Sequence, residues 1–278
     1  MKRFPVWRYV LAATLALVFL LPFYMIVRNA FSTDAGFTSP HFHWAGDLFT
    51  DPSQPWYANL ASVFTNRSVN LAGSLLNSVV VSVLQTLGTV VVSMLAAYGL
   101  ARYDGRASRI LLGLTLFTLM VPAAVTFIPT YIMTARLQWI DSYQGLVVPP
   151  MFSALATYLF RSHFLGFPHE LEEAARLDGA NPWQVFWRIV FPNSGGIIAA
   201  VGTITFMGSW NAFLWPMLVA RDDTRTLQVS LSRFMTSQSV EYPELFTGAM
   251  ISLIPVLIVF VVLQRWLVQG MELSGMSS

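Results

Sequence analysis

Six long hydrophobic stretches, none of which contains a charged residue, dominate the pattern of this chain. Each is close to the roughly 20 residues that a helix needs to cross the hydrocarbon core of a bilayer, or longer. Backbone groups cannot stay unpaired in lipid, so these stretches are predicted to be helices. One of them could be a buried helix of a soluble protein, but six in one chain indicate a membrane protein. The uncharged stretches are residues 9–27, 71–101, 110–135, 142–160, 193–220 and 245–264. The spans predicted from them cover approximately residues 9–28, 72–101, 110–135, 142–161, 194–220 and 245–265.

This pattern predicts an all-α, polytopic membrane protein with six transmembrane helices, built as a single transmembrane domain over residues 1–278. An even number of spans puts both termini on one side, and most of the lysine and arginine residues fall on that side. The positive-inside rule therefore predicts cytoplasmic termini. Residues 161–193 then form a cytoplasmic loop, and residues 30–70 and 221–244 form external loops. The first span is interpreted as a retained helix, because its apolar region is too long for a signal peptide.

Composition narrows the function further. Charged residues make up 11% of the chain, whereas a soluble domain usually carries about 25%. The chain has no cysteine, which excludes disulfides and thiolate metal sites. Its one lysine is Lys2, so it cannot carry a standard phosphate-binding loop for ATP. His41 and His43 lack a carboxylate partner and are interpreted as solvated loop residues rather than metal ligands. We therefore expect no catalytic residue and no metal site.

The cytoplasmic loop has the signals of two short helices. Pro168 fits the first position of a helix, and Gly179 suits the left-handed residue that ends one. Asn181 can cap a second helix, with Pro182 at its first position and Gln184 completing a capping box. Pro192 is expected to stop that second helix.

The first of these helices has a low surface. Ala174 and Ala175 are small, and Leu171 projects beside them, so the helix could enter a groove on another protein. The alternative is an amphipathic helix on the membrane surface, which would favour Lys, Arg and bulky apolar residues. This segment instead carries Glu170, Glu172 and Glu173.

At these residues the sequence resembles the permeases of ABC importers. Glu173-Ala174-Ala175, Gly179, Ile189 and Phe191-Pro192 match the family's EAA loop, except that Phe191 stands where the family has Leu. Several other segments resemble carbohydrate permeases of the maltose-transporter G-subunit type. They are Asn77-Ser78, residues 96–102 (AAYGLAR), residues 208–216 (GSWNAFLWP) and residues 264–270 (QRWLVQG). Ala212 departs from this pattern, because the family has Asp there.

The resemblance implies a non-catalytic permease subunit in the inner membrane of a prokaryote. Its implied partners are a homologous second permease, ATPase subunits that hold the ATP and magnesium, and an extracytoplasmic solute-binding protein. The EAA loop would be the coupling helix that enters a cleft of the ATPase, and we expect Glu172 and Glu173 to face that subunit. The residues implied in coupling are Leu171, Glu172, Glu173, Ala174, Ala175, Asp178, Gly179, Ile189 and Pro192.

The resemblance also implies that the transported substrate is a sugar, which fits spans without charge. A permease for glycerol-phosphate or an amino sugar stays open. A secondary transporter is disfavoured because it would place ionisable residues in the spans, and a membrane scaffold would not need a rigid EAA loop. In the external loop 221–244, the stretch Thr236–Ser239 either helps to release sugar from the docked binding protein or is a plain connector.

Four residues are candidates for the translocation path: Asn77, Gly208, Trp210 and Asn211. Asn211 is equally well explained as a hydrogen-bonding contact between helices. For Gln85 the interhelical contact is the better interpretation. Trp215, near the outer end of its span, is more consistent with an interfacial anchor than with a sugar-stacking residue.

Overall fold

The computed structural model describes residues 6–38, 44–49, 53–235 and 240–275, and for residues 266–275 it describes the backbone alone. His41, His43 and the stretch Thr236–Ser239 lie outside the described residues. Throughout the described ranges the named elements are helical, and the one β-type pairing is an isolated bridge between Met235 and Val240. The chain divides into two compact units. The first joins Met1–Leu76 to Thr226–Pro255, and the second joins Asn77–Arg225 to Val256–Ser278.

The first unit is dominated by α1, a helix that is buried only at its end. Arg28, Asn29 and Ala30 are its buried residues, and most of its other apolar side chains are exposed. An apolar helix of 25 residues with this exposure requires lipid or another chain around it. The helical elements of this unit are α1 (Val6–Ala30), α2 (Asp34–Thr38), η1 (Asp47–Phe49), α3 (Ala58–Thr65), the start of α4 (Leu71–Arg102), α13 (Leu227–Leu231), η5 (Ser232–Phe234) and the start of α14 (Tyr242–Gly275).

Polar side chains fix the C-terminal end of α1. The Asn59 side-chain amide donates to the carbonyls of Ala30 and Ser32, each at 2.9 Å. The Thr247 hydroxyl donates to the same Ala30 carbonyl at 3.1 Å. These bonds satisfy carbonyls that a helix end leaves without an intrahelical partner.

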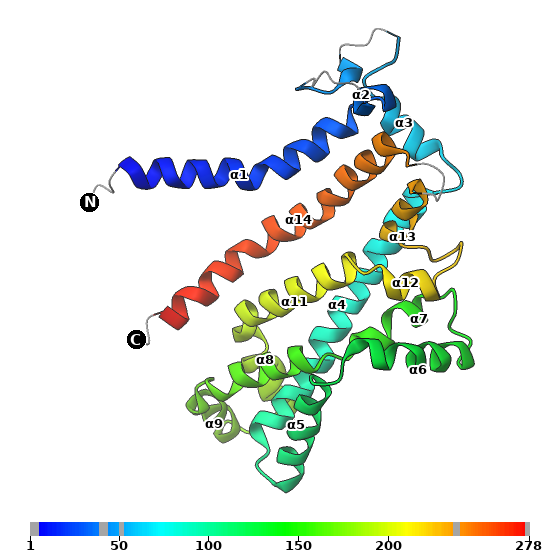
Figure 1. The fold of residues 1–278 in the computed structure, drawn as a ribbon. Helices are drawn as coiled ribbons and strands as arrows, with labels where there is room; N and C mark the ends of the chain where they lie inside the picture. Colours follow the sequence, from blue (N-terminus) through cyan, green and yellow to red (C-terminus); the bar gives the residue numbers. More distant parts are fainter. Residues whose placement is uncertain (1–5, 39–43, 50–52, 236–239, 276–278) are drawn as a thin grey trace. The chain divides into compact units, whose positions relative to one another are not determined.

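The second unit holds residues 161–193, where the sequence predicts two short helices, and it is built around α4 and α11, which run side by side (Figure 1). Its largest hydrophobic cluster joins α4, α8, the α10–η3 segment and α11 through residues such as Met94, Phe160, Phe186 and Val201. Its elements are the rest of α4, α5 (Arg106–Thr118), α6 (Ala123–Arg136), α7 (Tyr143–Val147), η2 (Pro149–Met151), α8 (Ala154–Leu165), α9 (His169–Leu177), α10 (Pro182–Val185), the π-turn η3 (Phe186–Val190), η4 (Pro192–Ser194), α11 (Gly195–Trp210), α12 (Leu214–Val219) and the end of α14.

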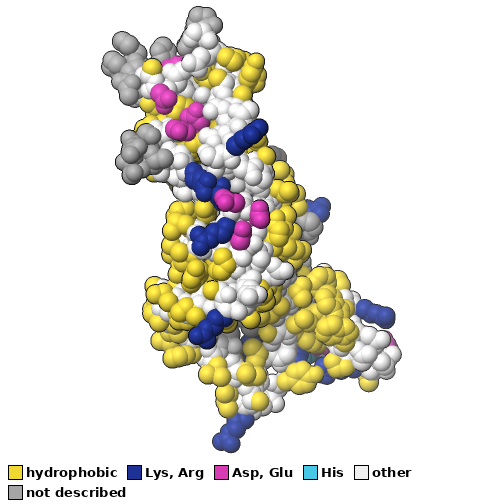
Figure 2. Space-filling model, turned by 90° about the vertical axis from the view of Figure 1, so that its right-hand side faces the viewer, with side chains coloured by type: hydrophobic (Ala, Val, Ile, Leu, Met, Phe, Trp, Pro, Cys, Tyr) yellow, Lys and Arg dark blue, Asp and Glu magenta, His cyan; other side chains and the backbone are white. Residues whose placement is uncertain are grey.

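Three described helices are long and apolar enough to cross a membrane, namely α1, α4 and residues Tyr242–Arg265 of α14. The number rises to five if each of two bent helix pairs is one span. The six spans expected from the sequence therefore stay a prediction. Hydrophobic side chains cover much of the visible face in Figure 2, and charged side chains of both signs lie between them.

Three of the expected spans are not single helices. Residues 194–220 form α11 and α12, which residues 211–213 separate. Residues 110–135 form α5 and α6, which meet at 101°. Pro122 precedes α6 as its N-cap residue, and a proline disfavours helical geometry in the residue before it. Residues 142–161 contain α7 and α8, separated by the turn that holds Pro149 and Pro150. Proline therefore divides the last two of these stretches into separate helices.

The break between α7 and α8 lies against a face of α4 with small and hydroxyl side chains. A Cβ on Gly88 would come within 2.1 Å of the Met151 sulfur, so only glycine allows this approach without a shift of that side chain. The Thr89 hydroxyl donates to the Met151 carbonyl at 2.9 Å. Small residues and hydroxyl groups thus let the broken segment pack closely on a membrane helix.

The turn after α12 is held by side chains from two other elements. Asp141 has a positive φ of 55°, and its Oδ1 accepts hydrogen bonds from the Arg221 amide, the Thr224 amide and the Thr224 hydroxyl. The Asn77 amide group of α4 donates to the carbonyls of Asp223 and Arg225. Burial raises the pKa of the Asp141 carboxyl, but the hydrogen bonds from Thr224 and Arg221 outweigh it and hold this pKa below its ordinary value.

We predict that Asp141→Asn destabilises the chain at neutral pH and does so less in acid. A carboxyl whose pKa is lower in the folded state stabilises the fold above its unfolded-state pKa of about 4, and this contribution is lost as the pH falls through the folded-state pKa. Asn tolerates the same left-handed backbone, so the charge is the variable tested. Thermal unfolding in detergent should give a lower Tm for the variant at pH 7 and a smaller difference from wild type below about pH 4. A Tm difference that is the same at both pH values would contradict this account.

Candidate coupling loop and translocation helix

The turn between α9 and α10 is fixed by its own hydrogen bonds. Gly179 has a φ of 86°, its amide donates to the Arg176 carbonyl at 3.0 Å, and the Ala180 amide donates to the Ala175 carbonyl at 2.9 Å. This pair of bonds is a Schellman motif, which ends α9 at the predicted glycine. The capping box of α10 is also confirmed, because Asn181 and Gln184 exchange two hydrogen bonds of 2.9 Å each. Pro168, which was predicted to be the first residue of this helix, is instead its N-cap residue, and α9 begins at His169.

The second short helix ends just before Pro192, as the sequence predicts. After α10 the chain makes the π-turn η3, in which the Phe191 amide donates to the Phe186 carbonyl at 2.8 Å. The helix ends at Val190, and Pro192 begins the next helical segment, which is inclined at 42° to it and runs into α11. Ile189 is partly buried against the main hydrophobic cluster of the unit, so within this chain it anchors the loop.

The outward surface of α9 is formed by most of the predicted coupling residues. Leu171, Glu173, Ala174, Asp178 and Gly179 are exposed, whereas Ala175 packs against the core. Sequence reasoning missed Leu177, which is 89% exposed beside the turn. The sequence could have indicated this residue, because a residue three positions after Ala174 lies on the same face of the helix.

Glu172 lies on the opposite face of α9 and is only 2% exposed. Its Oε1 accepts hydrogen bonds from Nε and Nη2 of Arg102 at 2.8 and 2.5 Å, and its Oε2 accepts one from the Tyr98 hydroxyl at 3.1 Å. Arg176 lies 4.0 Å from Oε2. The expectation that Glu172 faces another subunit is wrong. Its carboxylate binds α9 to the end of α4, which carries both Tyr98 and Arg102.

The four path candidates separate into two pairs. Asn77 and Trp210 belong to the scaffold. The Asn77 side chain bonds to the turn after α12 and accepts a hydrogen bond from the Tyr143 hydroxyl at 2.6 Å. Trp210 is 2% exposed and stacks on Phe206. Gly208 and Asn211 are exposed and lie three residues apart along one face at the end of α11.

Two other polar contacts join the helices of this unit. The Ser209 hydroxyl of α11 donates to Oε1 of Gln85 in α4 at 2.7 Å, which confirms the interhelical role predicted for Gln85. The Trp215 indole donates to the Gly145 carbonyl at 3.1 Å, so Trp215 holds α12 against α7. In the chain as described, Trp215 is therefore a contact between helices.

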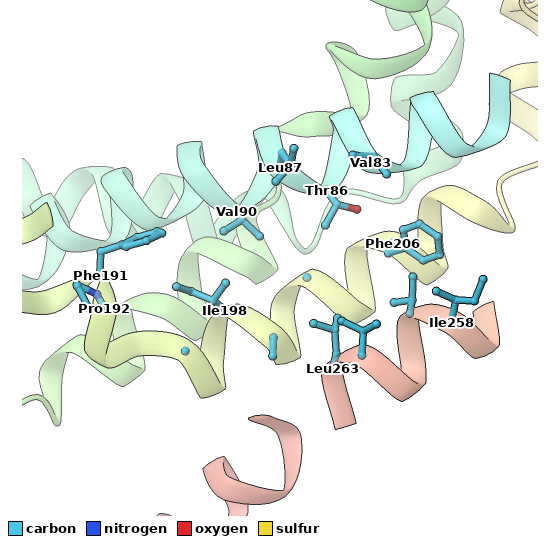
Figure 3. Close-up of a pocket in the computed structure, with 15 residues that line it drawn as sticks. Val83, Thr86, Leu87, Val90, Phe191, Pro192, Ile198, Phe206, Ile258 and Leu263 are labelled. Carbon is cyan, nitrogen blue, oxygen red and sulfur yellow. The ribbon is translucent and has the colours of Figure 1, made fainter. Parts of the chain in front are cut away.

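An apolar cavity of about 540 Å³ lies between α4, α11 and the end of α14 (Figure 3). Its lining includes Leu87, Ile198, Phe206 and Ile258, and the Thr86 hydroxyl is one of its few polar groups. A sugar would leave most of its hydroxyl groups without partners there, at a cost of roughly 1–3 kcal/mol for each buried group. This cavity is therefore not suited to a sugar.

The described residues contain no group of three or more His, Asp or Glu side chains placed to hold a metal ion. The site that the structure does assemble is a rigid loop of two short helices, bound to α4 through Glu172. Beside it lies α11, with a neutral exposed face.

Comparison with known proteins shows which family the chain resembles. Residues 89–273 match the family model described as the binding-protein-dependent transport system inner membrane component. The sn-glycerol-3-phosphate transport system permease protein UgpE of Yersinia pestis bv. Antiqua (strain Antiqua) is 37% identical over 227 residues, which cover 81% of this chain and 79% of that protein. The arabinooligosaccharides transport system permease protein AraQ of Bacillus subtilis (strain 168) is 30% identical over 262 residues, which cover 94% and 92%.

The fold is also similar to a chain in the crystal structure of a bacterial ABC transporter involved in the import of the acidic polysaccharide alginate. That chain has a TM-score of 0.78 and 23% sequence identity, and the match covers 95% of this chain and 99% of that one.

We predict that the two adjacent glutamates of α9 differ sharply when each is replaced by glutamine. Glu172→Gln leaves the Arg102 charge buried without its counter-ion and should lower stability by about 3–5 kcal/mol. Glu173→Gln changes an exposed residue and should cost less than about 0.5 kcal/mol. Thermal unfolding of the detergent-purified chain measures both. The double variant Arg102→Gln/Glu172→Gln should recover much of the loss, because it removes both charges. Equal Tm values for the two single variants would refute the assignment of Glu172.

Proposed function

This chain belongs to the family of binding-protein-dependent transport system inner membrane components, and we propose that with a homologous permease it forms the translocation path of an importer for a di- or oligosaccharide. The other partners are ATPase subunits, which supply ATP hydrolysis, and an external binding protein, which delivers the sugar. The chain itself is proposed to catalyse nothing. Because Lys2 is its one lysine, the lysine of a phosphate-binding loop must come from the ATPase.

The observation that carries this proposal is the rigid loop of α9 and α10. Leu171, Ala174 and Leu177 present a low apolar surface at spacings of three residues, with Glu173 and Asp178 beside it. Such a face fits a groove on another protein. Glu172 binds the same helix to α4, so a displacement of α9 by the ATPase would be passed to a membrane helix.

We place this loop and both termini on the cytoplasmic side. The distribution of lysine and arginine along the sequence supports this orientation. Closure of an ATPase dimer would then move the loop and change the side on which the path is open. Such rigid-body switching is driven by the difference in ATP affinity between two states.

We place the path along the exposed face of α11 that carries Gly208 and Asn211. A Cβ on Gly208 would meet no atom within 4 Å, so there is room beside this residue. The Asn211 side-chain amide donates to the Met207 carbonyl at 2.9 Å. Its Oδ1 takes no part in that bond and can accept a hydrogen bond from a sugar hydroxyl.

A sugar is favoured because this face is neutral and because AraQ, by its name, serves arabinooligosaccharides. A second candidate is sn-glycerol-3-phosphate, which is named for a relative with higher identity. A phosphate would favour an arginine or lysine in the path, and neither Gly208 nor Asn211 supplies a charge. An amino sugar remains a third substrate of the same type.

We predict that Gly179→Val abolishes substrate-stimulated ATPase activity while the chain still inserts and assembles. No atom lies within 4 Å of the position that a Cβ would take, so the effect arises from the positive φ, which a β-branched residue disfavours. Gly179→Asn is the matched control, because Asn tolerates this backbone conformation and should retain most of the activity. Wild-type stimulation in the assembled Val variant would contradict the coupling role.

We predict that Asn211→Ala lowers sugar uptake into proteoliposomes by about tenfold, the effect of one hydrogen bond worth about 1.4 kcal/mol. Asn193→Ala is the control, because Asn193 is also exposed and donates to the carbonyl four residues earlier, that of Ile189. Uptake driven by a binding protein loaded with arabinooligosaccharide is compared with uptake of sn-glycerol-3-phosphate. Transport of the phosphate alone would replace the sugar assignment, and equal uptake by both variants would remove Asn211 from the path.

A further inference from the structure

A second cavity, of about 380 Å³, lies where α4 ends against the turn between α9 and α10. We call it the arginine cavity. It is lined by Tyr98, Arg102, Tyr103, Arg176, Ala180 and Pro182. Unlike the apolar cavity between α4, α11 and α14, it contains two guanidinium groups and two phenol rings, so the chemistry of its occupant must be different.

The charges around this cavity do not cancel. Glu172 is buried beside it and neutralises one guanidinium, since its carboxylate bonds to Arg102 and lies 4.0 Å from Arg176. The side chain of Arg176 is 52% exposed. One carboxylate between two arginines leaves one positive charge, which matches a ligand that carries a single negative charge.

Arg102 also has an unused donor. Its side chain is 5% exposed, and Nε and Nη2 are bonded to Glu172. Its Nη1 is buried and has no hydrogen-bond partner among the described residues. A buried donor without a partner costs roughly 1–3 kcal/mol, so a group that fills the cavity and accepts this bond would be favoured.

The position of the cavity indicates what that group is. Arg102 is the last residue of α4, a helix apolar and long enough to cross the membrane, which would put the cavity near the level of the lipid headgroups. Tyrosine is enriched at this level, and Tyr98 and Tyr103 both line the cavity. Arginine forms bidentate hydrogen bonds with phosphate oxygens. A phosphodiester has one negative charge, and basic pockets beside membrane helices bind such headgroups.

We propose that the arginine cavity binds the phosphate of an anionic phospholipid headgroup, through Arg176 and the Nη1 group of Arg102. The bound lipid would neutralise the remaining positive charge and add a second contact between α9 and the end of α4, next to Glu172. The proposal concerns the membrane rather than the transported substrate, and it stands whichever substrate the path carries.

The test is the binding of phosphatidylglycerol to the assembled transporter in detergent, measured by native mass spectrometry. Arg176→Gln is the variant, because its exposed side chain can be changed without disturbing the buried pair. Arg188→Gln is the matched control, since Arg188 is exposed in the same loop, carries the same charge and does not line the cavity. We expect the apparent affinity of the tightest phosphatidylglycerol site to fall about tenfold in the first variant, or 1.4 kcal/mol, and to be unchanged in the second. Arg176→Lys should lie between them, because lysine keeps the charge without the planar fork.

Phosphatidylcholine and inorganic phosphate are the two comparison ligands. Weak binding of phosphatidylcholine supports the proposal, because its headgroup has no net charge. Inorganic phosphate that competes as well as phosphatidylglycerol at equal concentration would show a site for the free ion and overturn the assignment to lipid. Equal affinities in the Arg176→Gln and Arg188→Gln variants would overturn it as well. The proposal would also be overturned if phosphatidylglycerol bound to the isolated permease but not to the assembled transporter. In that case a carboxylate of the ATPase would occupy the cavity.

Discussion

The ion pair of the buried Glu172 carboxylate is the interaction on which the loop of α9 and α10 depends. Removing an ion from water costs several kcal/mol, and this cost is offset here by two hydrogen bonds from Arg102 and one from Tyr98. Both partners lie in the last turns of α4. A force applied to the outward face of α9 must therefore move the end of α4 or break this ion pair. The pair thus makes a short surface helix part of the membrane scaffold.

The membrane imposes the second constraint. Where a helix is interrupted, the backbone groups that lose their helical hydrogen bonds must be hydrogen-bonded to other groups of the protein. Side chains of α4 meet this requirement twice, through Thr89 at the Met151 carbonyl and through Asn77 at the turn after α12. The Trp215 indole meets it again at the Gly145 carbonyl. These polar side chains therefore serve hydrogen bonds within the protein. The polar residues that remain as candidates for contact with a substrate lie at the exposed end of α11.

Local signals in the sequence were sufficient to predict the turn between α9 and α10. They were insufficient to predict where the membrane-spanning segments break. The capping box at Asn181 and the left-handed glycine at Gly179 depend on a few neighbouring residues, and both were predictable. The burial of Glu172 was not, because its partner Arg102 is 70 residues away and adjacent glutamates look alike in a sequence. The bend at Pro122 shows the same limit. Proline is tolerated in some membrane helices, and only the tertiary neighbours decide whether the helix continues.

The closed hydrogen bonding of the turn at Asp178–Asn181 has a consequence for the entropy of assembly. Ordering the backbone of one flexible residue costs about 1–2 kcal/mol, so a loose turn of four residues would lose several kcal/mol on docking. Here the Schellman motif and the capping box set the conformation before any partner arrives. Binding energy from the outward face of α9 is then largely retained as affinity. A substitution that loosened this turn would weaken association without removing a single contact.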